Sequence, residues 1–149
     1  MVRISDALDG YLMRGFELDP RLARDTIPVM PLGLCDLRLM NDSRWPWLIL
    51  VPKRHDITEF HDLTPLDQTM LTFETALVAR CLKDTTKADK LNLGALGNVV
   101  PMLHVHVIAR NSGDTAWPGP VWGVGTVVPY APDAAEAFVQ TIRQKVLAA

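Results

Sequence analysis

The strongest constraint on this fold is a segment with helical spacing that stands between segments with strand spacing. Thr64, Pro65 and Asp67 form a helix start, with a capping side chain, a proline at the first helical position and an acid where a capping box requires one. Apolar residues then recur at steps of three and four to about residue 83, which predicts a long amphipathic helix. The side chains expected to face the core are Leu66, Met70, Phe73, Leu77 and Cys81.

Strands are predicted on both sides of this helix. Residues 34–40 alternate between apolar and polar side chains, and residues 47–51 are continuously apolar, so the first is expected to be half-buried and the second fully buried. Residues 41–43 are typical of a turn, which predicts an antiparallel hairpin. Two further strands are expected at residues 91–95 and 103–110.

The remaining elements complete an α+β pattern in one domain over residues 1–149. Residues 19–25 predict a short helix, because an aspartate that can cap is followed by a proline. Residues 133–147 predict a closing helix, whereas residues 117–123 contain two prolines and predict an aromatic loop. The closing helix is expected to pack through Ala135, Phe138, Ile142 and Val146. This order favours helices packed against an antiparallel sheet.

Composition and charge exclude several classes of protein. The 149 residues are 48% hydrophobic and carry a formal net charge of −2, so no global field attracts nucleic acid or an anionic membrane. Cys35 and Cys81 lie far apart and predict two buried, reduced thiols. Residues 1–10 contain no apolar region typical of a signal peptide, and the densest apolar stretch, residues 45–52, is too short to span a membrane. We therefore expect a cytoplasmic protein.

Two of the four histidines lie close together on a predicted strand. Alternate residues of a strand point to the same face, so His104 and His106 share one face. Leu103, Val105 and Val107 share the other, which is expected to pack against a helix. Two neighbouring imidazoles are costly without a role, because they repel when both are protonated and need partners when buried.

Such a pair suits two kinds of chemistry. Imidazoles bind Zn, Fe, Ni or Cu, but a metal site needs a third ligand, and residues 107–111 supply none. His55 and His61 could be recruited as ligands, but they lie in a predicted loop and in the approach to the long helix. Alternatively, one neutral imidazole attacks phosphorus, while the other holds the phosphoryl oxygens or protonates the leaving group.

The segment at residues 101–108 resembles the motif strand of the histidine triad (HIT) superfamily, His-x-His-x-His followed by two apolar residues. Residues 48–55 are similar to the apolar strand of that family, which ends in proline and a basic pair. The long helix and Asn92 follow in the order of the family, so the resemblance covers about residues 34–110. The loop at residues 117–123 is similar to a loop found in one bacterial branch of the superfamily, whose members are mostly hydrolases.

This resemblance implies a five-stranded antiparallel sheet with two main helices, commonly doubled into a homodimer. It also implies transfer or hydrolysis at the α-phosphate of a nucleotide through a covalent nucleotidyl-histidine, without a metal or other cofactor. By motif position His104 is the nucleophile and His106 lies near the phosphate. Asn92 and Asn98 match positions that contact phosphate oxygens, and Asn41 matches a position that binds the ribose hydroxyls.

Three positions depart from the family pattern. Met102 occupies the first triad position, Val99 replaces a common hydroxyl residue, and Trp47 stands where many members have another histidine. Each change removes a polar group from around the nucleophile, while His104 itself is retained. The triad is therefore incomplete by sequence.

Three functions follow as hypotheses. The first is a hydrolase of a nucleoside phosphoramidate, a dinucleoside polyphosphate or a related nucleotidyl ester. The second is a nucleotide-binding protein with weakened catalysis, and the third is a metal-dependent enzyme. His55 and His61 are expected on the surface, while Trp117 and Trp122 are suited either to stacking on a purine or to a dimer interface.

Overall fold

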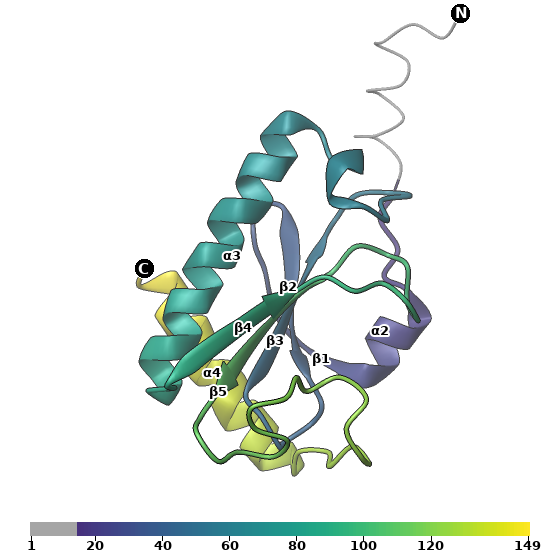
Figure 1. Cartoon of the computed structure of the whole chain (residues 1–149). Helices are drawn as coiled ribbons and strands as arrows, with labels where there is room; N and C mark the ends of the chain where they lie inside the picture. The colour runs from purple at the N-terminus through teal and green to yellow at the C-terminus, as the bar shows by residue number, and fades with distance from the viewer. Residues whose placement is uncertain (1–14) are drawn as a thin grey trace, which may run out of the picture.

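The computed structural model describes residues 15–149 as an antiparallel sheet with two helices on one face (Figure 1). The expected α+β fold with a five-stranded antiparallel sheet and two main helices is confirmed. The strands are β1 (Thr26–Pro31), β2 (Cys35–Met40), β3 (Trp47–Pro52), β4 (Lys90–Gly94) and β5 (Val105–Arg110). The helices are α2 (Pro20–Asp25), α3 (Pro65–Thr86) and α4 (Pro132–Leu147), with a short 3-10 helix η1 (Phe60–Asp62).

Strand β3 lies at the centre of the sheet, whose order is β1-β2-β3-β5-β4. The predicted hairpin is β2–β3, and both predicted strands after the long helix are present within two residues of the expected bounds. Strand β1 is not predicted by the sequence pattern, because it contains Pro28 and Pro31. An edge strand tolerates prolines because its outward N–H groups need no partner in the sheet.

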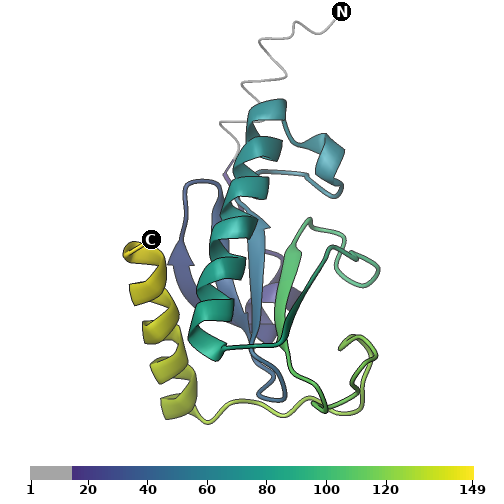
Figure 2. The same ribbon diagram turned by 60° about the vertical axis from the view of Figure 1, so that its left-hand side comes forward.

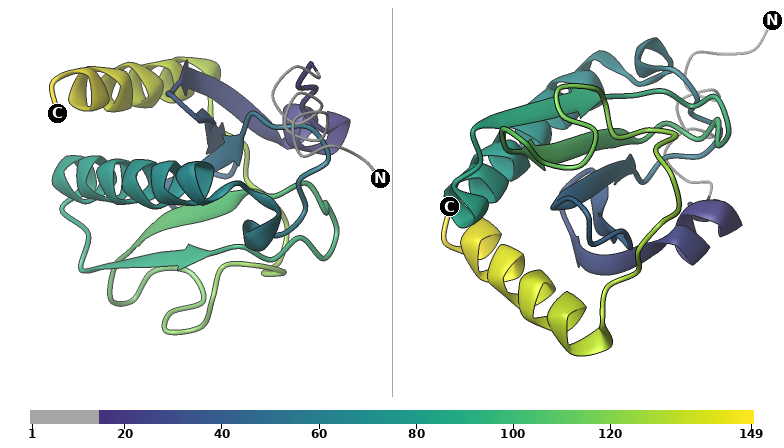
Figure 3. Two further views of the ribbon diagram at one scale, coloured as in Figure 1. Left: turned by 90° about the horizontal axis from the view of Figure 1, so that it is seen from above. Right: turned by 60° about the horizontal axis from the view of Figure 1, so that its bottom comes forward.

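Helices α3 and α4 run alongside each other and cover one face of the sheet, which we call the helix face (Figures 2 and 3). Aliphatic side chains from β1, β2, β3 and β5 pack there against α3 and α4. Asp19 and Thr64 cap α2 and α3 as predicted, with the Asp19 side chain accepting from the backbone of Arg21 at 2.8 Å. Of the four residues expected to bury α4, Phe138 is only partly buried.

The predicted core side of α3 is wrong for Leu66 and Phe73, which are both 70% exposed. Met70 and Leu77 are partly buried, and Cys81 is buried as expected. The residues that α3 buries are Asp67, Leu71, Glu74, Val78, Cys81 and Leu82. The periodicity misled because two carboxylates lie on the inward side of the helix.

Both inward carboxylates have partners that compensate their burial. Glu74 accepts hydrogen bonds from the backbone N–H groups of Leu34 and Cys35 at 2.7 and 2.9 Å, so α3 is attached to the β1–β2 turn. Asp67 accepts from Arg54 at 2.7 and 3.2 Å. A charged side chain can be buried among apolar side chains when it is paired and hydrogen-bonded in this way.

The opposite face of the sheet is also buried, and we call it the loop face. Helix α2 and the segment at residues 117–128 cover it, away from α3 and α4 (Figure 3, right). Trp47, Ile49 and Ile108 supply its floor from β3 and β5. This cover consists mainly of loops and aromatic side chains rather than of long helices.

Both cysteines are buried and free, as expected, and burial raises the pKa of each thiol. Within residues 15–149 no helix is long and apolar enough to cross a membrane. The expectation that residues 1–10 carry no signal peptide lies outside the described residues.

Candidate functional site

The histidine pair lies on the loop face, as its alternation with apolar residues predicts. His106 is in β5 and His104 immediately precedes this strand, and their ring centroids are 4.8 Å apart. Both residues are buried, with exposed fractions of 7% for His104 and 5% for His106. Leu103 and Val107 point to the helix face. The strand therefore holds two imidazoles in contact on one side of the sheet.

A backbone carbonyl fixes the orientation of His104. Its Nδ1 lies 2.7 Å from the carbonyl oxygen of Met102. A carbonyl oxygen only accepts hydrogen bonds, so Nδ1 carries the proton and donates it. In the neutral imidazole this arrangement leaves the lone pair on Nε2, the nitrogen that can attack phosphorus or bind a metal.

An indole fixes the orientation of His106. The Nε1–H of Trp47 donates to Nδ1 of His106 at 2.9 Å. Indole N–H only donates, so Nδ1 of His106 is the acceptor and the proton of the neutral ring lies on Nε2. Burial, and secondly the neighbouring His104, lower the pKa of His106 to about 3. His106 is therefore neutral throughout the physiological range.

Trp47 has a role that the sequence analysis missed. By sequence it is only the loss of a histidine from this position, yet its N–H is a hydrogen-bond donor inside the site. Strand pairing explains the contact, because Ile49 lies opposite His106 and Trp47 lies opposite Ile108 on neighbouring strands. The available signal was that Trp47 and Ile49 are two positions apart on β3 and therefore point to the same face of the sheet.

The two tryptophans of the 117–123 loop occupy different surroundings. The Trp122 ring lies 5.3 Å from His106 and 6.5 Å from Trp47, both in edge contact. The absent side chain of Gly94 makes room for it, since a Cβ there would lie 3.0 Å from Trp122 Cη2. Within the described part of the chain, Nε1 of Trp122 is buried without a hydrogen-bond partner. The Trp117 ring instead lies beside the guanidinium of Arg110, at 5.5 Å.

The three asparagines singled out by sequence lie in separate places. Asn92 is on β4 opposite Ile108, and its side-chain oxygen accepts from Arg110 at 3.2 Å. Asn98 is exposed in the loop between β4 and β5. Asn41 accepts from the backbone of Tyr130 at 2.9 Å. The structure therefore brings Asn92 to the same face as the histidine pair but does not gather all three side chains at one point.

Arg110 is a second buried group that the sequence analysis did not single out. Its guanidinium donates to Asp114 at 2.7 and 2.8 Å, to the Gly119 carbonyl at 2.8 Å and to Asn92. Hydrogen bonds from Arg110 also lower the pKa of Asp114. No helical spacing signals this pair, because Arg110 ends β5 and Asp114 lies in the loop that follows. This cluster ties the end of β5 to the loop that carries Trp122.

Three cavities are lined by residues of the site or by their neighbours in the chain. One cavity of about 500 Å³ is lined by Asn41 and Trp47 together with residues of the 121–129 segment. A cavity of about 200 Å³ is lined by His104, Met102 and Pro101, among others. Met102 and Pro101 also line a larger cavity of about 770 Å³. The small cavity at His104 therefore adjoins the larger one, with which it shares Thr58, Pro101 and Met102, whereas the Asn41 cavity reaches the site through Trp47.

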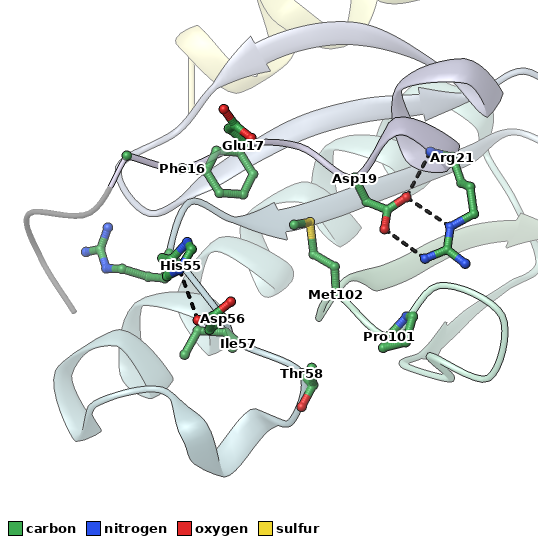
Figure 4. Close-up of a pocket in the computed structure, with 12 residues that line it drawn as sticks. Phe16, Glu17, Asp19, Arg21, His55, Asp56, Ile57, Thr58, Pro101 and Met102 are labelled. Carbon is green, nitrogen blue, oxygen red and sulfur yellow. Dashed lines mark hydrogen bonds and ion pairs between the residues drawn. The ribbon is translucent and has the colours of Figure 1, made fainter. Parts of the chain in front are cut away.

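The larger cavity is strongly charged (Figure 4). Asp19 and Arg21 form an ion pair at its wall, and the hydrogen bond from Arg21 lowers the pKa of Asp19 to about 2. On the other side, Nε2 of His55 lies 2.9 Å from a carboxylate oxygen of Asp56. His61 lies outside this cavity in η1, and its side chain is 83% exposed as expected.

No group of three or more histidine, cysteine or acidic side chains that could hold a metal ion occurs within residues 15–149. His104 and His106 would contribute two ligands, and Nδ1 of His106 already accepts the Trp47 hydrogen bond. The described residues therefore do not assemble the third ligand that the metal hypothesis requires.

The fold and the site define an α+β protein with a buried histidine pair beside the central strand. The family model of the HIT domain matches residues 24–113. The chain thus belongs to the histidine triad (HIT) family, a family of nucleotide-binding proteins and hydrolases.

Several solved structures are similar to this chain over nearly their whole length. A histidine triad protein from Sinorhizobium meliloti 1021 is 61% identical, with a TM-score of 0.86, over 87% of this chain and 96% of that one. One from Bradyrhizobium japonicum is 44% identical, with a TM-score of 0.87, over 89% and 99%. One from Marinobacter aquaeolei VT8 is 41% identical, with a TM-score of 0.88, over 91% and 98%. No curated protein matches the chain significantly.

Proposed function

We propose that this protein is a nucleotidyl hydrolase that acts at the α-phosphate of a nucleotide through a covalent intermediate on His104. The carrying observation is the 2.7 Å contact between Nδ1 of His104 and the Met102 carbonyl, because it leaves Nε2 as the free lone pair. Nucleophilic catalysis requires such an oriented, unprotonated nitrogen. The substrate is a nucleoside phosphoramidate, a dinucleoside polyphosphate or a related nucleotidyl ester.

The remaining residues of the site have positioning roles in this proposal. The Nε2–H of His106 donates to a phosphoryl oxygen, since the other nitrogen of this ring accepts from Trp47. The amides of Asn92 and Asn98 bind the phosphate from the β4 side. Asn41 binds the ribose, which is supported by its place in the cavity that Trp47 also lines. The triad is incomplete, with Met102 in the first position, and no metal or other cofactor takes part.

The test is release of AMP from an adenosine phosphoramidate, a diadenosine polyphosphate and a nucleotidyl sugar, with a chelator present throughout. We expect His104→Ala to abolish release, because the attacking nitrogen is lost. His61→Ala is the matched control, since this imidazole is 83% exposed and lies outside the site. Equal release by wild type and His104→Ala would contradict the proposal. Release that stops in the chelator would favour the metal hypothesis.

A second candidate is a nucleotide-binding protein with weakened catalysis. The observation that favours it is that Met102, a side chain without a proton to donate, lines the cavity of His104 where the family has an imidazole. This candidate predicts that AMP raises the melting temperature while no panel member is turned over.

We also propose that the protein is a cytoplasmic homodimer. Strand β4 is an edge of the sheet, and edges expose unpaired backbone groups that a second chain can use. Leu93 on β4 is 54% exposed, and Phe73 on α3 is 70% exposed. Light scattering tests this proposal: Leu93→Lys is expected to yield monomers, whereas Leu147→Lys, on the exposed end of α4, leaves the dimer intact. A monomeric wild type would contradict it.

A further inference from the structure

The hydrogen bond from Trp47 restricts what His106 can contribute to catalysis. With Nδ1 accepting from the indole at 2.9 Å, the only proton of the neutral ring is on Nε2. Donating a hydrogen bond from Nε2 leaves the ring unchanged. Transferring that proton to a leaving group would produce an imidazolate, a strong base that nothing in this buried site neutralises. His106 is therefore a hydrogen-bond donor rather than a proton donor.

The surroundings of His106 keep it neutral. Its described neighbours on β3, β4 and the covering loop are Trp47, Ile49, Gly94 and Trp122, all without charge. Among the described residues, the titratable neighbour of its ring is His104, at a centroid distance of 4.8 Å. A second positive charge beside a protonated His104 would be repelled, and burial disfavours the cation as well. Both effects lower the pKa of His106 to about 3.

The other described side chains around the pair do not replace the missing acid. Glu59 lines the small cavity together with His104, but its carboxylate accepts from the backbone N–H of Asp62 at the start of η1. Met102 stands in the first triad position, and a thioether has no proton to give. His104 holds its own Nδ1 proton on the Met102 carbonyl and uses Nε2 for attack. The Nε2 of His55 contacts the carboxylate of Asp56, and His55 lies across the large cavity from Pro101 (Figure 4). The leaving group therefore departs without a proton from the histidine pair.

We propose that Trp47 positions His106 as a neutral hydrogen-bond donor and thereby restricts the enzyme to nucleotide anhydrides, whose leaving group departs as a stable anion such as a carboxylate or a phosphate. Phosphoramidates and alkyl esters release amines and alkoxides, which need a proton during bond breaking. The inference rests on the proposed function and selects one class among its candidate substrates.

The two chemical steps balance without an acid. In the first, Nε2 of His104 forms a bond to the α-phosphorus, the bond from phosphorus to the bridging oxygen breaks, and the electron pair leaves with the anion. The imidazole, now bearing phosphorus on Nε2 and a proton on Nδ1, is cationic, and the Met102 carbonyl accepts from it. In the second, water attacks phosphorus, the pair returns to Nε2, and one proton passes to solvent.

The first experiment is NMR of the imidazole nitrogens in the free protein, which needs no substrate. We expect the Nε2–H form of His106 to persist between about pH 5 and 8 in wild type. Trp47→Phe keeps an aromatic ring and removes the donor, so a population with Nδ1–H is expected to appear. Trp117→Phe is the control, because Trp117 lies beside Arg110. A charged His106, or an Nδ1–H form in wild type, would overturn the inference even if Trp47→Phe failed to fold.

The second experiment compares two substrates with the same AMP group, an acyl adenylate and an adenosine phosphoramidate. General acid catalysis contributes about 10²–10⁴-fold, so wild type is expected to prefer the acyl adenylate by at least about 100-fold over the ratio of their uncatalysed rates. In Trp47→Phe this preference is expected to fall. Equal or reversed preference would overturn the inference and leave the hydrolase proposal standing. No release from either substrate, with none from the wider panel, would overturn both.

Discussion

The two faces of the sheet are buried by different means. On the helix face, two helices of 16 and 22 residues press aliphatic side chains against the strands. On the loop face, a six-residue helix and an irregular segment that carries Trp122 cover two further tryptophans and two histidines. Interiors packed with aliphatic side chains contribute mainly to stability. The loop face instead holds polar ring atoms in fixed directions, and it is there that we locate function.

Strand β3 allows the sharpest comparison, because neighbouring residues point to opposite faces. Leu50 and Ile49 are both fully buried, Leu50 against the helices and Ile49 opposite His106. Leu50→Ala is expected to reduce the free energy of unfolding by about 2–5 kcal/mol and to leave turnover unchanged. Ile49→Ala is expected to reduce the free energy of unfolding by less, because the covering loop can collapse into the space that the side chain leaves. It is also expected to reduce turnover. Urea unfolding and AMP release measure both, and equal effects of the two variants would contradict the distinction.

The next prediction concerns the carboxylate that joins α3 to the sheet. Glu74→Ala leaves the backbone N–H groups of Leu34 and Cys35 without their acceptor, at about 1–3 kcal/mol for each buried group. Glu74→Gln, which keeps one acceptor oxygen, is expected to lose about half as much. Thermal unfolding tests both variants. A Glu74→Ala protein as stable as wild type would show that these bonds contribute little.

A third prediction uses the pH dependence of stability. The pKa of His106 is about 3 in the folded protein and about 6.5 in an unfolded chain. Between these values only the unfolded chain binds the proton, so stability falls as the pH falls below about 6.5, by up to about 1.4 kcal/mol per pH unit. His106→Gln is expected to flatten this slope between about pH 6.5 and 5. An unchanged slope in denaturant titrations would contradict a neutral, buried His106.

The smallest effect is expected from adding a single methyl group at a glycine, as in the two separate variants Gly94→Ala and Gly33→Ala. A Cβ at Gly94 would lie 3.0 Å from Trp122 on the loop face, and one at Gly33 would lie 3.2 Å from the flexible Met70 on the helix side. Gly94→Ala is expected to cost about 1 kcal/mol and to shift tryptophan fluorescence, because the Trp122 ring must move. Gly33→Ala is expected to leave the fluorescence unchanged. The same spectrum for both variants would argue against tight packing over His106.

The fold was largely predictable, and the site only in part. The α2, β2, β3 and α4 segments carry local signals, and the alternation at His104 and His106 gave the face correctly. Strand β1 was missed because its two prolines are atypical of a strand. The inward side of α3 was missed because its buried carboxylates have partners distant in the chain. Trp47 was missed for a related reason, since its partner lies on a neighbouring strand.

The arrangement of the tryptophans has a spectroscopic consequence. Trp45, Trp47 and Trp122 form a chain of edge contacts at 6.2 and 6.5 Å on the loop face, while the long helices lie on the other face. Near-ultraviolet circular dichroism reports the fixed packing of aromatic rings, and far-ultraviolet circular dichroism reports helices. Melting followed at both wavelengths therefore observes the two faces separately, without a label, and a loop face that loosens first would appear as two transitions.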